Sequence, residues 1–129
     1  GANAVTQRAA ITALTTDLRP TWEMAEEFTR RRKRVLELVN EIPGLKCSEP
    51  EGAFYIFPDV SSYYGKKDGD TVIENSNDLC MYILNKAHVS SVMGDAFGDP
   101  NCIRFSFANS MENIEKAWAR IKLALSELK

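Results

Sequence analysis

Hydrophobic positions in the first third of the chain recur with helical spacing. Residues from Ala4 to Leu14 are small or helix-forming, with apolar residues on one side, and Arg19-Pro20 interrupts them. From about Thr21 to Ile42, apolar residues follow one another at helical intervals: Met24, Phe28, Val35, Leu38, Val39 and Ile42. The pattern predicts a short helix, a break and then a helix of about twenty residues, which Pro43-Gly44 ends.

Charged residues are ordered along the long helix. Acidic residues come first, and basic residues occupy 30–34. The spacing predicts ion pairs between Glu26 and Arg30 and between Glu27 and Arg31. Five consecutive helical residues turn about 100° each and so surround the helix instead of forming one basic face. We therefore expect local ion pairs and no nucleic-acid partner.

The middle of the chain predicts one strand, a loop and one helix. The segment 51–59 is rich in aromatic and β-branched residues between Gly52 and Pro58, which indicates a short buried strand. Residues 59–75 have no periodicity and are expected to form an exposed loop. Ser76 is then the predicted N-cap of a helix, and the apolar residues of that helix recur at i, i+3, i+4 and i+7: Cys80, Ile83, Leu84 and Ala87.

The last third predicts two strands and a final helix. Residues 88–92 are expected to form a strand that leaves the preceding helix, and 101–107 alternate strictly. In that second strand Ile103, Phe105 and Phe107 are expected to face the core, with Cys102, Arg104 and Ser106 on the other face. Ser110 is expected to cap a helix with this apolar stripe: Ile114, Ala117, Trp118, Ile121, Leu125 and Leu128.

These elements predict an α+β fold for residues 1–129 as one domain. We expect two layers, in which helices cover a short, mostly antiparallel sheet of about three strands. The composition is 44% hydrophobic and 26% charged, with a net charge of −2. Such values exclude a disordered or low-complexity chain and do not indicate a protein built to hold nucleic acid or an anionic membrane. No apolar run approaches the roughly 18 residues that a membrane span needs, so no membrane partner is expected.

Metal and disulfide chemistry are not indicated. Cys47, Cys80 and Cys102 form no CxxC pair and are odd in number, which favours reduced thiols in a cytoplasmic protein. His88 is the only histidine and has no metal-ligating neighbour in the sequence, so we expect no metal site. The chain begins at Gly1 without an initiator Met, and our hypothesis is that it is a piece of a longer protein.

Arg104 is the candidate binding residue. Its strand position sends a charged side chain to the face opposite Ile103 and Phe105. A charge in a short apolar strand is costly unless it is paired, and the planar guanidinium fits a carboxylate through two parallel hydrogen bonds. From spacing alone, a structural ion pair or an edge-strand charge in water is the simpler interpretation, and a ligand carboxylate is the alternative.

The residues around Arg104 supply no defensible catalytic group. Gly94 and Gly98 allow a sharp turn or a close approach of a ligand, but their spacing is not that of a phosphate-binding loop. None of the eight lysines lies in the apolar setting that a Schiff-base lysine needs. We therefore predict no catalytic residue in this chain.

Six short motifs, in order along the chain, resemble the C-terminal part of pyridoxal-phosphate aminotransferases of the aspartate aminotransferase family. They are Gly1-Ala-Asn-x-x-x-Gln7-Arg8-Ala-Ala, Phe28-x-Arg-Arg-Arg32, Pro43-Gly44, Pro50-x-Gly52-Ala-Phe-Tyr-x-Phe-Pro-Asp59, Gly94-x-x-Phe-Gly98 and Ile103-Arg104-x-Ser106-x-Ala108. Each motif alone is weak, whereas six at the right intervals are fairly specific. Family members are roughly three times as long, so the resemblance implies the small domain without the large cofactor domain.

The resemblance implies roles for several segments and residues. Residues 1–19 would form a leading helix, 20–42 the long helix that links the domains, and 43–129 the α+β body of the small domain. Arg104 would bind the substrate α-carboxylate, and the loop carrying Gly94, Phe97 and Gly98 would lie near the site. No residue of this chain would bind the cofactor.

The resemblance also implies the chemistry of the whole protein. A homodimeric, cytoplasmic enzyme would move an amino group between an amino acid, with aspartate or glutamate expected, and a 2-oxo acid. Pyridoxal phosphate and its Schiff-base lysine would belong to the large domain, so the isolated chain is predicted to be inactive. Two alternatives stay open: a free-standing regulatory domain that binds a carboxylate metabolite, and a pyridoxal-phosphate lyase of the same fold.

Overall fold

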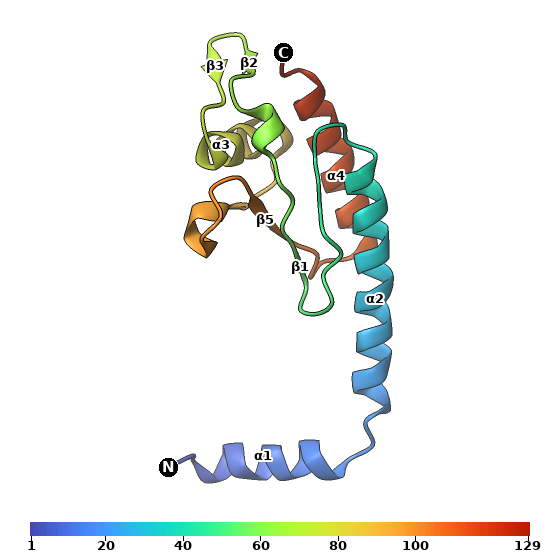
Figure 1. The fold of residues 1–129 in the computed structure, drawn as a ribbon. Helices are drawn as coiled ribbons and strands as arrows, with labels where there is room; N and C mark the ends of the chain where they lie inside the picture. The colour runs from blue at the N-terminus through green and yellow to red at the C-terminus, as the bar shows by residue number, and fades with distance from the viewer.

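The computed structural model describes all residues from 1 to 129. Its helices, strands and 3₁₀ turns follow one another along the chain as Figure 1 shows. In chain order they are α1 (Ala4–Thr15), α2 (Arg19–Asn40), β1 (Tyr55–Ile56), η1 (Ser61–Tyr63), β2 (Lys67–Asp68), β3 (Thr71–Val72), α3 (Ser76–Ala87), β4 (Val92–Met93), η2 (Gly94–Phe97), β5 (Ile103–Ser106) and α4 (Met111–Ser126).

The main sheet has three antiparallel strands in the order β1-β5-β4. Strand β5 is central, with Tyr55 opposite Ser106 on one side and Val92 opposite Arg104 on the other. Two isolated bridges, Lys46 to Asp59 and Asp59 to Cys102, continue the antiparallel pairing beyond the regular strands. The α+β fold with a short three-stranded antiparallel sheet is therefore confirmed.

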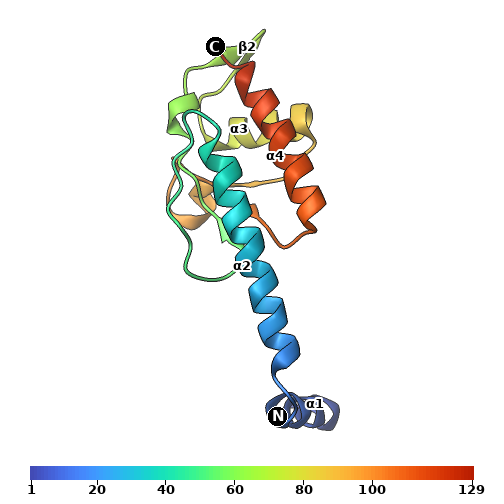
Figure 2. The ribbon, with the colours of Figure 1, turned by 90° about the vertical axis from the view of Figure 1, so that its right-hand side faces the viewer.

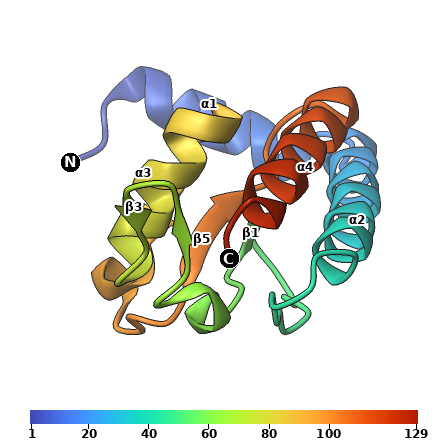
Figure 3. The ribbon, with the colours of Figure 1, turned by 90° about the horizontal axis from the view of Figure 1, so that it is seen from above.

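Three helices form the second layer. Helix α4 lies between α2 and α3 on one side of the sheet (Figure 3). The central strand sends Ile103 and Phe105 into this layer, where the Phe105 ring centroid lies 5.1 Å from that of Trp118 on α4. These contacts belong to one core of 21 buried residues, which brings together α2, α3, α4 and the sheet. The strict alternation of β5 thus produces one buried face and one open face.

The two ends of α2 have different surroundings. Val35 and Val39, in its second half, are buried in the core, whereas Trp22 and Met24, in its first half, are 59% and 58% exposed. The expected place of Met24 in a buried stripe is therefore wrong. Helix α1 has no buried residue and lies apart from the body, below the start of α2 and across its direction (Figures 1 and 2). The packed body thus begins midway along α2.

Ion pairs on α2 differ in part from the expected ones. Glu27 accepts hydrogen bonds from both Arg30, at 2.9 Å, and Arg31, at 2.8 Å. The pair of Glu27 with Arg31 is confirmed, whereas Glu26 does not pair with Arg30 because Glu27 takes that guanidinium instead. Further along, Arg34 binds Glu115 of α4 at 3.0 Å and so ties the two longest helices together.

Residues 59–75 are more ordered than the sequence predicted. They contain the turn η1 and a hairpin of β2 with β3, in which Lys67 pairs with Val72. Val60, Tyr63 and Ile73 are buried, so the expectation of an exposed loop is wrong for these positions. These three buried residues are unevenly spaced, by three and then by ten positions, which is why no periodicity marks them.

Three further expectations need correction. The N-cap of α3 is Asn75, whose side chain accepts a hydrogen bond from the Asp78 amide, and Ser76 is the first helical residue. His88 is not in a strand: it ends α3 in the left-handed conformation, with φ of 54°, and β4 is limited to Val92–Met93. Cys102 is buried, although alternation placed it on the open face, because the loop before β5 folds over it.

Candidate functional site

Strand β5 presents Arg104 on the open face of the sheet. Its neighbours Ile103 and Phe105 are buried on the helical side, so alternation places the arginine side chain opposite to them. Antiparallel partners flank β5 on both sides, which fixes the backbone at this point. Arg104 itself is half-buried.

Two aromatic rings lie against the guanidinium of Arg104. Its Cζ atom lies 4.3 Å from the ring centroid of Tyr55 on β1 and 4.1 Å from that of Phe97 on η2. Both distances are well within the roughly 6 Å range of a cation–π contact. The structure thus brings Phe97 to Arg104, and it adds Tyr55, which sequence reasoning did not single out.

Arg104 has no polar partner within this chain. Each of the ten ion pairs of the structure uses another basic residue, and no side-chain hydrogen bond involves Arg104. The interpretation of Arg104 as a structural ion pair is therefore wrong for this chain. A guanidinium has five N–H donors in one plane, and stacked rings occupy none of them. All five donors of Arg104 remain open to a ligand.

Gly94 and Gly98 shape the turn that carries Phe97. The Gly94 amide donates to the Cys102 carbonyl at 2.8 Å, and its own carbonyl accepts from the Asp99 amide at 3.2 Å. Gly94 is buried, and a β-carbon there would lie within 2.9 Å of the Cys102 carbonyl carbon, which is too close for any side chain. Gly98 ends the turn with φ of +87°, a conformation that favours glycine.

One side-chain hydrogen bond joins this turn to helix α3. The Ser76 hydroxyl donates to the Asp95 carboxylate at 2.9 Å, and Ser76 is fully buried. The sequence pattern assigned Ser76 to capping and gave no role to Asp95. The only signal that could have indicated their contact is the presence of a carboxylate in a glycine turn and of a hydroxyl at a helix start.

The thiols near the site are poor nucleophiles. Burial, together with the hydrogen bond to Asp99, raises the pKa of Cys102 to about 12. Burial also raises the pKa values of Cys47 and Cys80. All three cysteines are free, and thiolate, the reactive form, is scarce at neutral pH when the pKa is raised. No group of three His, Cys, Asp or Glu side chains is arranged to hold a metal ion.

The lysines of the chain do not fit a Schiff-base site. Seven of the eight are exposed, and Lys66 is half-buried. Lys86 lies 2.7 Å from Asp68 and 3.0 Å from Glu127, and these hydrogen bonds raise its pKa. A lysine that forms a Schiff base needs the opposite shift. Lys86 therefore does not fit a Schiff-base site for pyridoxal phosphate.

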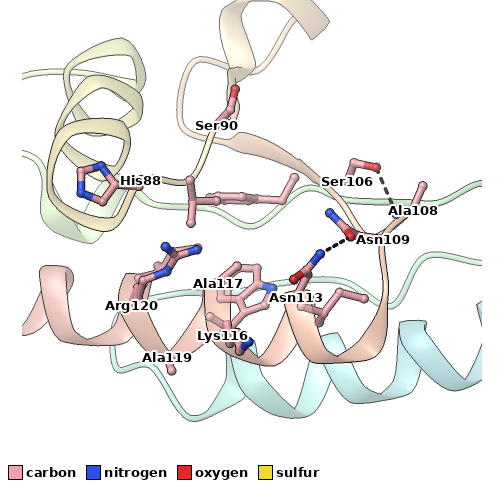
Figure 4. Close-up of a pocket in the computed structure, with 15 residues that line it drawn as sticks. His88, Ser90, Ser106, Ala108, Asn109, Asn113, Lys116, Ala117, Ala119 and Arg120 are labelled. Atoms are coloured by element: carbon pink, nitrogen blue, oxygen red, sulfur yellow. Dashed lines mark hydrogen bonds between the residues drawn. The ribbon is translucent and has the colours of Figure 1, made fainter.

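A separate hollow lies away from the predicted site residues. It measures about 950 Å³ and is bounded by the end of α3, by β5 and by α4 (Figure 4). His88 and Arg120 lie at its rim, and Asn113 donates a hydrogen bond to Asn109 at 3.0 Å inside it. Its lining includes Phe105, on the helical side of the sheet, and none of the predicted site residues.

No helix of the structure combines the length and the apolar character needed to cross a membrane.

Comparison with known proteins identifies the family. The family model described as aminotransferase class I and II matches residues 2–121. The chain belongs to this family. The class I and II assignment agrees with the order of motifs in the sequence and with the α+β fold of the body.

Relatives extend over the whole chain. It is 47% identical over 135 residues to the "Bifunctional aspartate aminotransferase and glutamate/aspartate-prephenate aminotransferase" of Petunia hybrida, and the alignment covers 100% of this chain. The solved aspartate aminotransferase of Rhizobium meliloti superposes with a TM-score of 0.93 at 37% identity over 97% of the chain. The alanine aminotransferase of Pyrococcus furiosus superposes with a TM-score of 0.85 at 31% identity over the same share.

The chain spans only part of each relative. It covers 28% of the Petunia protein, 32% of the Rhizobium structure and 30% of the Pyrococcus structure. The same portion is therefore shared by aminotransferases that are named for different amino acids. The sequence and fold of this portion are thus common to the aspartate and the alanine aminotransferase.

Proposed function

We propose that this chain is the small domain of a pyridoxal-phosphate-dependent aminotransferase and that Arg104 binds the α-carboxylate of the substrate. The enzyme moves an amino group between an amino acid, aspartate or glutamate, and a 2-oxo acid. The observation that carries this proposal is the guanidinium of Arg104, which contacts two aromatic rings and has no acidic partner in the chain. A carboxylate supplies the charge and the two acceptor oxygens that this group lacks.

The relatives support separate places in the enzyme for recognition of the α-carboxylate and for selection of the substrate side chain. An α-carboxylate is common to all amino-acid substrates, and this portion of the fold is shared by relatives named for aspartate and for alanine. We therefore assign recognition of the α-carboxylate to this chain and selection of the substrate side chain to the remainder of the protein. The preference for aspartate or glutamate rests on the names of the relatives.

Pyridoxal phosphate, when bound, accepts the amino group from one substrate and returns it to the next. Because the lysines here are exposed or only half-buried and lack the apolar surroundings that a Schiff-base lysine needs, we place the cofactor on residues outside this chain. We expect the isolated chain to be inactive. We also assign the full protein to a homodimer in the cytoplasm, as the resemblance to the aspartate aminotransferase family implies.

The exposed start of the chain supports a division into three segments. Residues 1–19 form the leading helix, 20–42 the linking helix and 43–129 the body that closes over the substrate. Helix α1 buries no residue, and the first half of α2 leaves Trp22 largely exposed. Apolar side chains in such positions have a role when another part of the protein covers them.

An arginine exchange in the full-length enzyme tests the proposal. Arg104→Lys replaces a bidentate fork by a point charge, so we expect kcat/KM for L-aspartate to fall by about 10- to 100-fold. Arg120→Lys is the matched control, since Arg120 has no ion pair and lies at the separate hollow. An unchanged kcat/KM in Arg104→Lys would overturn the assignment.

Product analysis separates the remaining alternatives. With L-aspartate and 2-oxoglutarate, an aminotransferase yields L-glutamate in an amount equal to the aspartate consumed. A lyase consumes aspartate without forming glutamate, and a regulatory domain consumes none. Either of the last two outcomes contradicts the proposed reaction.

A further inference from the structure

We infer that Tyr55 and Phe97 are positioning residues that hold the Arg104 guanidinium in the plane in which it receives a carboxylate. This inference rests on the proposed role of Arg104 and adds two side chains to it. Neither ring is expected to touch the reacting atoms. Their effect is on the orientation of the cation and hence on the affinity for the carboxylate.

Arg104 depends on these rings because nothing else fixes its side chain. An arginine has several rotatable bonds, and ordering it costs about 1.5 to 2 kcal/mol of conformational free energy. Hydrogen bonds usually supply that order, but Arg104 makes none within the chain. Contacts with two rings, whose centroids lie 4.3 Å and 4.1 Å from its Cζ atom, restrict the motion of the guanidinium before a ligand arrives.

The orientation in which the rings hold the Arg104 guanidinium determines how it can bind a carboxylate. Aromatic rings attract a cation through the negative charge on their faces, so the stacked cation keeps its charge and its hydrogen-bond donors. Where a ring covers a face of a guanidinium, a ligand approaches along the edge instead. The edge is where a carboxylate makes two parallel hydrogen bonds. A lysine in the same place has no plane for the rings to orient.

The two aromatic side chains beside Arg104, which we call its walls, are held in place by different parts of the fold. Tyr55 belongs to the sheet, opposite Ser106, and its ring contacts that of Phe54 in a tilted arrangement, with centroids 4.7 Å apart and an interplanar angle of 46°. Phe97 belongs to the turn η2, where the edge of one ring meets the face of the other in its contact with Phe57, at a centroid distance of 6.1 Å and an angle of 89°. Strand pairing thus fixes one wall, and the position of the glycine turn sets the other.

The Phe97 wall is in turn fixed from behind. Asp95 lies two positions before Phe97 and accepts a hydrogen bond from the buried hydroxyl of Ser76 on α3. Gly94, at the start of the turn, packs so closely that no β-carbon fits. Displacement of either contact therefore moves Phe97 away from Arg104 without altering Arg104 or its strand.

Affinity for a non-reacting carboxylate tests the inference. The probe is succinate, which carries two carboxylates and no amino group, titrated calorimetrically into the full-length holoenzyme. Removal of one ring in Tyr55→Leu or Phe97→Leu is expected to raise the Kd by about three- to tenfold. Tyr55→Phe and Phe97→Tyr keep the rings and should restore the affinity to within about twofold. Phe28→Leu removes the ring next to another arginine, Arg31, and serves as the control.

A double-variant cycle distinguishes positioning from general damage. If the rings act through the guanidinium plane, Arg104→Lys weakens succinate binding strongly in the parent and several-fold less in Phe97→Leu, which has already lost the orientation. Equal effects of Arg104→Lys in both backgrounds, or an unchanged Kd in both leucine variants, overturn the inference. If Arg104→Lys itself leaves the Kd unchanged in the parent, the proposed carboxylate role fails instead.

Thermal unfolding of each variant separates loss of fold from loss of orientation. The effect on Kd must persist in a variant whose unfolding midpoint matches that of Phe28→Leu. If the loss of succinate affinity is proportional to the decrease in the unfolding midpoint across all variants, the two rings only stabilise the fold and the inference is wrong. Retention of the midpoint with loss of affinity supports it.

Discussion

Substitution of Gly94 by alanine should disrupt the turn that carries Phe97. The added β-carbon would lie within 2.9 Å of the Cys102 carbonyl carbon and closer still to the carbonyl oxygens of Asp99 and Cys102. All these atoms belong to the backbone, which cannot rotate away as a flexible side chain can. The turn must therefore move as a unit and separate from β5.

The magnitude follows from the contacts at risk. Forcing extra volume into a packed site costs about 1 to 3 kcal/mol. Movement of the turn also weakens two backbone hydrogen bonds, Gly94 to Cys102 at 2.8 Å and Asp99 to Gly94 at 3.2 Å, and each contributes about 1 kcal/mol. We expect Gly94→Ala to lower the free energy of unfolding by about 3 to 5 kcal/mol.

Gly98→Ala is the matched control at the other end of the same turn. Gly98 has φ of +87°, and no atom lies within 4 Å of the position that a β-carbon would occupy there. Only backbone strain of about 1 to 2 kcal/mol therefore opposes alanine at this position. Urea denaturation of the chain, followed by circular dichroism, measures both variants. A loss in Gly94→Ala no larger than that in Gly98→Ala would refute the reasoning from close approach.

Three further predictions concern the core and the ionisable groups. Trp118→Ala, at a position 5% exposed in the core, should lower the unfolding free energy by about 3 to 5 kcal/mol in the same assay, and an unchanged urea midpoint would contradict this. The hydrogen bond from Lys86 holds the pKa of Asp68 below its usual value. The stabilisation from this pair is therefore complete above about pH 4 and is lost as the pH falls through the lower pKa of Asp68 in the folded state. Urea midpoints measured from about pH 5 to 2 should consequently depend less on pH in Lys86→Met than in the parent. Burial and, to a smaller extent, Asp99 raise the pKa of Cys102 to about 12. Iodoacetamide at pH 8 should therefore alkylate Cys102 slowly, and faster in Asp99→Asn, with the extent of alkylation followed by mass spectrometry. Equal rates in the two proteins would show that Asp99 does not raise the pKa of Cys102.

The sequence predicts well those elements that bury a continuous stripe. The α4 stripe, including Trp118, appears in the structure as expected, and so does the alternation that points Phe105 inward and Arg104 outward. Both follow from local periodicity, because a regular element repeats its buried face at a fixed interval. The α+β fold class could therefore be predicted from the order of these elements.

Local ambiguity explains several of the errors. Asn75 and Ser76 are adjacent and both are good capping residues, so composition alone does not choose between them. The hairpin of β2 and β3 has strands of only two residues, which is too short for an alternating pattern to be recognised. Met24 fits the helical stripe of α2 but lies beyond the end of the body that the stripe packs against.

The surroundings of Arg104 could be predicted only in part. Alternation gives the face on which its side chain lies, but the choice among an ion pair, water and a ligand depends on residues distant in sequence. Tyr55 and Phe97 reach it through strand pairing and through a glycine turn, neither of which leaves a local signal. The resemblance to aminotransferases suggested a role for Arg104 but not the two rings that enclose it.

The contact between α2 and α4 sets the order in which the chain can fold. Arg34 and Glu115 are 81 residues apart, and so are Glu41 and Lys122, which also pair. Closing a loop of this length costs about 4 kcal/mol of chain entropy. Synthesis at about 5 to 20 residues per second separates the two helices by roughly 4 to 16 seconds, whereas a helix forms in about a microsecond. The apolar side of α2 is therefore exposed to solvent and to chaperones on the ribosome until α4 arrives.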